Sequence, residues 1–251
     1  MKLRSGIARP NYLICVERIE ALKRVYDTGE EILIGAGATH TQVLEHPLIQ
    51  QHFPVLAKAI KVLGSPPIRH MGTIGGNIVT ASPAGDTLPA LYVLAAEVEI
   101  QSRNRSRRVK LGDFILGPGD VDLKSGEILT GIVLRKSPKW NIHHYEKVGR
   151  RKAQACAIAS MAAVLQVSET GNIDRARLAW GSVGPIVARS REIEEALVGQ
   201  PISAEIFKSV CNLVQEVISP IDDIRASAEY RRAVAAALVQ RLAKYEVQME
   251  R

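Results

Sequence analysis

The hydrophobic pattern of this chain changes from a helical to a strand period near residue 97. Residues 53–64, FPVLAKAIKVLG, carry apolar side chains at helical spacing, and Gly64 followed by Pro66 and Pro67 ends that segment. The segments after residue 97 have the composition of strands: EVEIQS (97–102), RRVKL (107–111) and EILTGIVL (127–134). This order predicts an α+β fold.

The second half of the chain begins after the best linker in the sequence, Lys136-Ser-Pro-Lys139. Three strands then form an expected antiparallel meander, with Glu169-Thr-Gly-Asn172 as one of its turns. Three helical segments follow, at residues 190–199, 203–218 and 227–245. We therefore expect two domains, residues 1–137 and residues 138–251.

The composition excludes several classes of protein. With 251 residues and 46% hydrophobic residues, the chain can bury a substantial core. No apolar run reaches the ~20 residues of a membrane span, and no signal segment follows Met1, so we expect a cytoplasmic protein without a membrane span. The three cysteines, Cys15, Cys156 and Cys211, lack any CxxC spacing, and we expect no metal site.

The formal charge of +7 is concentrated in RNRSRRVK, Arg103 to Lys110. Flanking strand patterns predict a hairpin that turns at Asn104–Ser106. A basic hairpin can bind nucleic acid or can be a solvated sheet edge. No aromatic residues interleave with these arginines to stack on bases, so the solvated edge is favoured and no nucleic-acid partner is expected.

The first forty residues give weaker signals. Residues 11–22, NYLICVERIEAL, suit either a helix or a strand. Thr39 and Gln42 have the spacing of a capping box and predict a helix start. Gly35-Ala-Gly37 has the first two glycines of a dinucleotide fingerprint, but His40 stands where the third glycine belongs, so a tight strand-to-helix turn is favoured over phosphate binding.

The stretch TIGGNIVTASPAGD, Thr73 to Asp86, is the strongest candidate for chemistry. Gly75 and Gly76 can adopt positive φ and present successive backbone N–H groups to an anion, with Thr73 and Asn77 adding side-chain donors. Asp86 can accept hydrogen bonds from hydroxyl groups of the same ligand, or cap the helix that follows. The residues alone leave a nucleotide diphosphate cradle and an ordinary Gly-Gly turn equally open.

Lys147 lies in the second polar cluster, YEKVGRRKAQA, Tyr145 to Ala155, on a predicted strand with apolar neighbours. Such a cation can extend to solvent or reach a ligand. The residues alone favour the extension to solvent.

Together, these stretches resemble one known family. TIGGNIVTASPAGDTLPAL resembles the second FAD-binding motif of the flavoprotein subunits of molybdenum hydroxylases, the family of carbon monoxide dehydrogenase medium subunits and xanthine dehydrogenase FAD subunits. RPNYLICVERIEAL, GEILTGIVL, YEKVGRRKAQACAIASMA and SAEYRRAVAAALVQRLA are similar to other segments of that family, so nearly the whole chain is covered.

The resemblance implies a FAD-binding domain of the vanillyl-alcohol-oxidase-like type, followed by a C-terminal domain with a three-stranded antiparallel sheet and helices. It implies that the subunit transfers electrons from iron–sulfur clusters through FAD to NAD or another acceptor. Molybdopterin would belong to a large partner subunit, and two-iron, two-sulfur clusters to a small one. The positions that match the family's cofactor-binding residues are Thr73, Ile74, Gly75, Gly76, Asn77, Asp86, Leu63, Leu129 and Lys147.

The sequence begins with MKLRSGIARPN, which resembles the residues that follow the family's first pyrophosphate loop. We therefore expect the FAD-binding domain to lack its N-terminal subdomain. The alternative function to a working flavoprotein is a flavin-free subunit that serves a structural role in the same complex. A basic nucleic-acid binder acting through Arg103 to Lys110 is a third, less favoured, reading.

Overall fold

The structure is a computed structural model that describes residues 6, 10–136, 138–151 and 154–246. Its first half contains a five-stranded antiparallel sheet of order β1-β2-β7-β3-β4. Strands far apart in sequence are neighbours in this sheet, because β7 pairs with both β2 and β3. The strands are β1 Val25–Asp27, β2 Glu31–Gly35, β3 Glu97–Gln101, β4 Ser106–Lys110 and β7 Ile128–Arg135.

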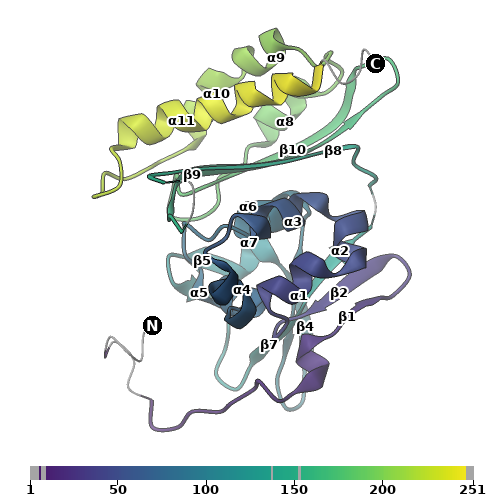
Figure 1. Cartoon of the computed structure of the whole chain (residues 1–251), viewed down its shortest axis with the longest axis vertical. Coiled ribbons are helices and arrows are strands. Elements are labelled where there is room, and N and C mark those ends of the chain that lie inside the picture. The colour runs from purple at the N-terminus through teal and green to yellow at the C-terminus, as the bar shows by residue number, and fades with distance from the viewer. Residues whose placement is uncertain (1–5, 7–9, 137, 152–153, 247–251) are drawn as a thin grey trace.

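Short helices cover this sheet and fill the space between it and the second half of the chain (Figure 1). Proline at the first turn begins α2, α3, α4 and α6, where its missing N–H costs nothing. The helical elements are η1 Glu20–Lys23, α1 His40–Glu45, α2 Pro47–His52, α3 Pro54–Lys61, α4 Pro66–Met71, α5 Ile74–Thr80, α6 Leu88–Val93 and α7 Leu111–Phe114, with a small hairpin of β5 Ile115–Gly117 and β6 Asp120–Val121.

The second half is a three-stranded antiparallel meander of order β10-β9-β8, with helices on its outer face (Figure 1). Serine side chains cap three of these helices: Ser190 caps α8, Ser203 caps α9 and Ser227 caps α11. The elements are β8 Ile142–Gly149, β9 Ala157–Val167, β10 Ile173–Gly181, α8 Arg191–Leu197, α9 Ala204–Ser209, α10 Cys211–Val217, α11 Ala228–Gln240 and η2 Arg241–Tyr245.

The meander separates two hydrophobic cores. On β9, Ala162 and Val164 belong to the core shared with α3 and α6, whereas Met161 and Ala163 belong to the core beneath α8–α11. Successive strand residues face opposite sides of a sheet, so β9 is buried on both faces. The meander thereby joins the two halves of the molecule through apolar packing.

The predicted α+β architecture is confirmed, including the meander and its turn, where Gly171 has a φ of +82°. The Thr39–Gln42 capping box is also present. The structure differs from the expected elements in two places. Residues 203–218 form two helices, α9 and α10, that meet at Val210, and residues 11–22 contain only the 3-10 turn η1. Most side chains between Asn11 and Glu20 are exposed and have no neighbouring strand.

The basic hairpin is confirmed as β3–β4, and two of its arginines, Arg107 and Arg108, are paired with carboxylates. Arg107 pairs with Asp122 and Glu127 at 2.7 and 2.8 Å. Arg108 pairs with Glu31 and Glu99, both at 2.8 Å. These ion pairs give the arginines a role in the sheet edge. Within the described ranges, no helix is long and apolar enough to span a bilayer, and no cluster of three or more His, Cys, Asp or Glu side chains could hold a metal ion.

Candidate functional site

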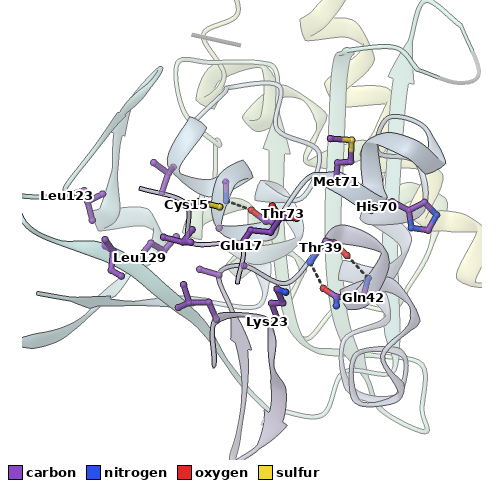
Figure 2. A pocket seen from close by; sticks show the side chains of 18 of the residues that line it. Cys15, Glu17, Lys23, Thr39, Gln42, His70, Met71, Thr73, Leu123 and Leu129 are labelled. Carbon is purple, nitrogen blue, oxygen red and sulfur yellow. Dashed lines mark hydrogen bonds between the residues drawn. The ribbon is translucent and has the colours of Figure 1, made fainter. Parts of the chain in front are cut away.

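A cavity of about 750 Å³ opens between the start of α5, the end of β2 and the strand β7 (Figure 2). Thr73, Gly75, Gly76 and Leu129, four of the predicted site residues, line it. The remaining lining residues come from the N-terminal segment, from the chain after β2, from α1, α4 and α5, and from around β7: Cys15, Val16, Glu17, Leu22, Lys23, Ala36, Gly37, Thr39, Gln42, His70, Met71, Val79, Leu123, Glu127 and Ile128.

One wall of this cavity is the start of α5. The Thr73 hydroxyl accepts a hydrogen bond from the Gly76 N–H at 3.1 Å and caps the helix. The Ile74 N–H donates to Ala38 O at 3.0 Å, and the Gly75 N–H donates to Ala36 O at 2.9 Å. The helix start is thus fixed against the chain that leaves β2.

The expectation of a positive-φ glycine nest was wrong. Gly75 and Gly76 are helical, and neither has a positive φ. Gly75 is required for close approach instead, because a Cβ there would lie 2.6 Å from both the Cβ and the carbonyl oxygen of Ala36. Since both amide hydrogens are already bonded within the chain, polar contacts to a ligand fall to the Thr73 hydroxyl and to side chains such as Gln42, His70 and Lys23.

Gly35 ends β2 and Gly37 follows it, and the structure shows why these positions need residues without a side chain: both pack against the segment around Leu22. The Gly35 N–H donates to Arg24 O at 2.8 Å, and the Gly37 N–H donates to Leu22 O at 2.7 Å. A Cβ at Gly35 would collide with the Leu22 backbone. These contacts hold the segment around Leu22 against the cavity, which Gly37 and Ala36 also line.

The segment Cys15–Glu17 and the side chains of Thr39, Gln42, His70 and Met71 were missed as candidate site residues. Thr39 and Gln42 had been assigned to helix capping, which they do perform. The signals for the N-terminal segment were its run of apolar residues without a clear period and the resemblance of RPNYLICVERIEAL to a segment of the family, and neither named a site residue. Long-range contacts of Leu22, Gly35 and Gly37 bring this segment to the site, and no local pattern encodes them.

Asp86 and Lys147 form a buried ion pair. The Lys147 Nζ lies 2.6 Å from Asp86 Oδ2, with side-chain exposures of 8% and 10% respectively. Burial raises the pKa of Asp86 above its ordinary value, and the neighbouring Lys147 ammonium opposes that shift. The second carboxylate oxygen, Oδ1, is buried and has no hydrogen-bond partner among the described residues.

Two expectations about this pair were wrong. Asp86 does not cap the helix α6, whose N-cap residue is Thr87 with no side-chain capping bond, because the Asp86 carboxylate turns to Lys147 instead. Lys147 does not extend to solvent: its Nζ also donates to Val62 O at 3.2 Å, next to the buried Leu63. It lines a smaller cavity of about 360 Å³ with Val62, Glu146, Val148, Gly149, Arg151, Gln154, Ala155 and Arg241.

The remaining predicted residues are Asn77, Ile74, Leu63 and Leu129. Asn77 Oδ1 accepts a hydrogen bond from the Thr87 hydroxyl at 2.5 Å, which connects α5 to the residue after Asp86. The Ile74 side chain is fully buried in the first core. Leu63 is 7% exposed and lies outside the large cavity, whereas Leu129 lines it. The structure therefore places four of the predicted residues at the large cavity and Lys147 at the smaller one, with Ile74 in a packing role.

Comparison with known proteins now identifies the relatives of this chain. Residues 1–137 match the family described as the FAD binding domain in molybdopterin dehydrogenase, and residues 143–245 match the CO dehydrogenase flavoprotein C-terminal domain. The chain belongs to the FAD-binding medium subunits of molybdopterin dehydrogenases. The resemblance identified from the sequence is thus confirmed.

Named relatives include the glyceraldehyde dehydrogenase medium chain of Sulfolobus acidocaldarius, which is 32% identical over 97% of this chain and 85% of its own length. The nicotinate dehydrogenase FAD-subunit of Eubacterium barkeri is 29% identical over 93% of this chain and 80% of its length. A chain of the solved Cu,Mo-CO dehydrogenase superposes with a TM-score of 0.92 at 26% identity, over 98% of this chain and 86% of that one.

The large cavity fits part of the cofactor that the family's description names. Its volume lies within the ~300–1,000 Å³ of typical cofactor sites. Gly76 is exposed and leaves this side of α5 without a side chain, and a Cβ there would come within 2.9 Å of the Thr73 hydroxyl. Hydroxyl, amide, imidazole and ammonium groups line the cavity beside apolar Leu129, Val79 and Ile128. Such a mixture suits a ligand with both phosphates and aromatic rings.

Proposed function

We propose that this chain is the FAD-binding, electron-transferring subunit of a molybdenum hydroxylase complex. The observation that supports this most directly is the cavity of about 750 Å³ lined by Thr73, Gly75, Gly76 and Leu129, in a chain of this family. FAD, when bound, supplies one- and two-electron redox chemistry. The chain's own residues hold and orient it.

Each part of the site has a distinct role in this proposal. Thr73 donates its hydroxyl hydrogen to the diphosphate while its oxygen still accepts from Gly76, since a hydroxyl does both. Gly75 and Gly76 keep the approach to the helix free of side chains. Asp86, with its unpartnered Oδ1, accepts from cofactor hydroxyl groups, and Lys147 approaches the cofactor from the second domain.

The division of the chain follows the same proposal. Residues 1–137 form the cofactor-binding domain, and residues 138–251 form the domain that carries Lys147 to it. The partners are a large molybdopterin-binding subunit and a small subunit with two-iron, two-sulfur clusters. NAD or another acceptor receives the electrons.

Thr73→Val tests the cofactor site against a matched control, Ser227→Ala. Both substitutions remove an N-cap hydroxyl and lower stability by about 1 kcal/mol, but only Thr73 lines the cavity. We expect Thr73→Val to weaken FAD binding by about tenfold, the cost of one charge-assisted hydrogen bond, and Ser227→Ala to leave it unchanged. FAD fluorescence titration measures both.

Equal affinities for the two variants would contradict the role of Thr73. The electron-transfer role is tested by adding the partner subunits and substrate to the flavin-loaded chain and following the flavin absorbance. Loss of the flavin absorbance after substrate is added supports electron transfer to the flavin. A complex that assembles and turns over with an artificial acceptor, while the chain binds no FAD, would instead support the flavin-free structural subunit.

A further inference from the structure

A second cavity, of about 540 Å³, lies where the first sheet meets β10, and it shares no residue with the two cavities of the proposed cofactor site. The end of α6, the start of α7 and the ends of β3, β4 and β7 form one side, and residues of β10 and the segment after it form the other. Its lining includes Tyr92, Glu97, Lys110, Asp113, Arg135, Arg177 and Arg189.

Four cations and two carboxylates face this cavity. Lys110, Arg135, Arg177 and Arg189 come from four separate segments, and they outnumber Glu97 and Asp113. Arg189 is paired with Glu194 at 2.7 Å, and Arg135 has a looser 3.5 Å contact with Glu31. In the described part of the chain, Lys110 and Arg177 have no carboxylate within ion-pair distance. Lys110 and Arg177 are therefore the two cations of this lining without a paired carboxylate among the described residues, and Glu97 and Asp113 lie in the same lining.

Arg177 is oriented for binding an anion. Its Nη1 donates to Val93 O at 3.2 Å, and its guanidinium lies 5.4 Å from the centre of the Trp140 ring. These contacts fix the plane of the group while Nε and Nη2 have no hydrogen-bond partner in the described chain. Burial, and next the charge of Arg189, lower the pKa of Arg177 from its ordinary value, and the charge of Glu194 opposes that shift.

Tyr92 adds an unused donor to the same cavity. Its side chain is 9% exposed, and its hydroxyl is buried without a hydrogen-bond partner in the described residues. Burial and the charge of Asp113 raise the pKa of Tyr92 to about 12, so the hydroxyl keeps its hydrogen at neutral pH. A buried hydroxyl without a partner costs stability unless a ligand or water satisfies it.

We propose that this cavity binds a phosphate monoester of a small polar molecule. The two free nitrogens of Arg177, the Lys110 ammonium and the Tyr92 hydroxyl supply donors for the three terminal oxygens of a phosphate ester. The volume exceeds that of phosphate alone, and Leu94 and Leu111 provide apolar surface for the rest of the ligand. The site is independent of FAD binding, and it adds a ligand to the proposed function.

Calorimetric titration of the full chain tests this site with ribose 5-phosphate, inorganic phosphate and unphosphorylated ribose as probes. Saturating FAD is present in one series and absent in the other, so that binding in the large cavity is recognised by competition. We expect ribose 5-phosphate to bind in both series, inorganic phosphate to bind more weakly, and ribose not to bind.

Substitutions then locate the binding. Arg177→Gln and Lys110→Gln should each weaken ribose 5-phosphate binding by about tenfold or more, because each removes a charge-assisted contact. Arg103→Gln, which removes an exposed cation in the turn between β3 and β4 and outside the cavity, is the matched control and should leave binding unchanged. If Arg177→Gln fails to fold, Lys110→Gln and Tyr92→Phe are measured instead, and each should weaken ribose 5-phosphate binding.

Absence of binding by both phosphate probes would overturn the proposal. Equal weakening by Arg103→Gln would also overturn it, since that result would indicate nonspecific attraction to a basic protein. Competition by FAD would place the phosphate in the large cavity instead. None of these outcomes depends on whether the chain transfers electrons, so failure here and failure of the proposed function are distinguishable.

Discussion

The Asp86–Lys147 pair shows what a single residue contributes beyond its local sequence. A carboxylate and an ammonium 2.6 Å apart, each about nine-tenths buried, satisfy one another, but neither tolerates loss of its partner. Asp86 precedes α6 directly, which suggests a helix cap, yet its partner comes from β8, 61 residues later. The local sequence could identify Asp86 as a polar site but could not indicate this pairing.

Asp86→Ala is therefore expected to destabilise the protein by about 3–5 kcal/mol, because it leaves the Lys147 charge buried without a partner. Asp27→Ala, which removes a pair with Lys136 in a more exposed setting, is the control and should have a much smaller effect. Urea unfolding followed by circular dichroism measures both. A change at Asp86 no larger than that at Asp27 would mean that Lys147 finds another partner or reaches solvent.

Gly75 was singled out for a positive φ, and the structure gives a different physical reason for a glycine at this position. Its sequence context suggested a positive φ, whereas its backbone is helical and its missing Cβ allows α5 to approach Ala36. A distance between two segments that are far apart in sequence cannot be derived from local patterns. The same limit applies to Gly35 and Gly37, which pack against Leu22.

At the scale of elements, the contact between the start of α5 and the end of β2 determines the wall of the cavity. Gly75→Ala should destabilise this contact by about 1–3 kcal/mol, since a Cβ would overlap backbone atoms that cannot rotate away. Gly112→Ala is the matched control: its Cβ would meet only the Tyr92 ring at an ordinary 3.7 Å. Chemical unfolding of the two variants compares them, and equal stability would indicate that α5 shifts without cost.

The loop before α11 is held by another buried cation. Arg231, 3% exposed, donates to Ser182 O at 3.0 Å and to Asp223 Oδ1 at 2.7 Å, and its contact with Ile158 O joins the helix to β9. Hydrogen bonding from the Arg225 N–H, and further from the Arg231 side chain, lowers the pKa of Asp223 to about 2. The ionised carboxylate is therefore the form that stabilises this loop.

A depressed carboxyl pKa stabilises the fold above the unfolded-state value of 3.8, and this contribution is lost as the pH falls toward about 2. We expect Asp223→Asn to be less stable than the unmodified chain at neutral pH, and to lose less stability on acidification through this range. Thermal unfolding across the pH series measures the difference. Parallel acid profiles for the two proteins would contradict the assignment.

The elements themselves followed from sequence periodicity to a large extent. The meander β8–β10 and the hairpin β3–β4 were predicted because alternation and turn residues are local signals. The break between α9 and α10 at Val210 was not, because no glycine or proline marks it. Residues 11–22 gave no clear period, and they form an irregular segment whose place depends on contacts with Gly35 and Gly37.

For the whole molecule, the predicted residues divide into two groups. Thr73, Gly75, Gly76 and Leu129 line the large cavity, while Asp86 and Lys147 join the two halves of the chain. The central claim is that FAD occupies this large cavity. An exposed cysteine, Cys15, lies in its wall and offers a direct test (Figure 2).

The decisive measurement is the rate of alkylation of each cysteine by iodoacetamide, read by mass spectrometry with and without saturating FAD. Cys156 is also exposed but lines neither this cavity nor the other two, so it serves as the internal control. We predict that FAD slows alkylation of Cys15 by about tenfold or more and leaves Cys156 unchanged. Unchanged labelling of Cys15 at an FAD concentration where binding is saturated would contradict the proposed location of the cofactor.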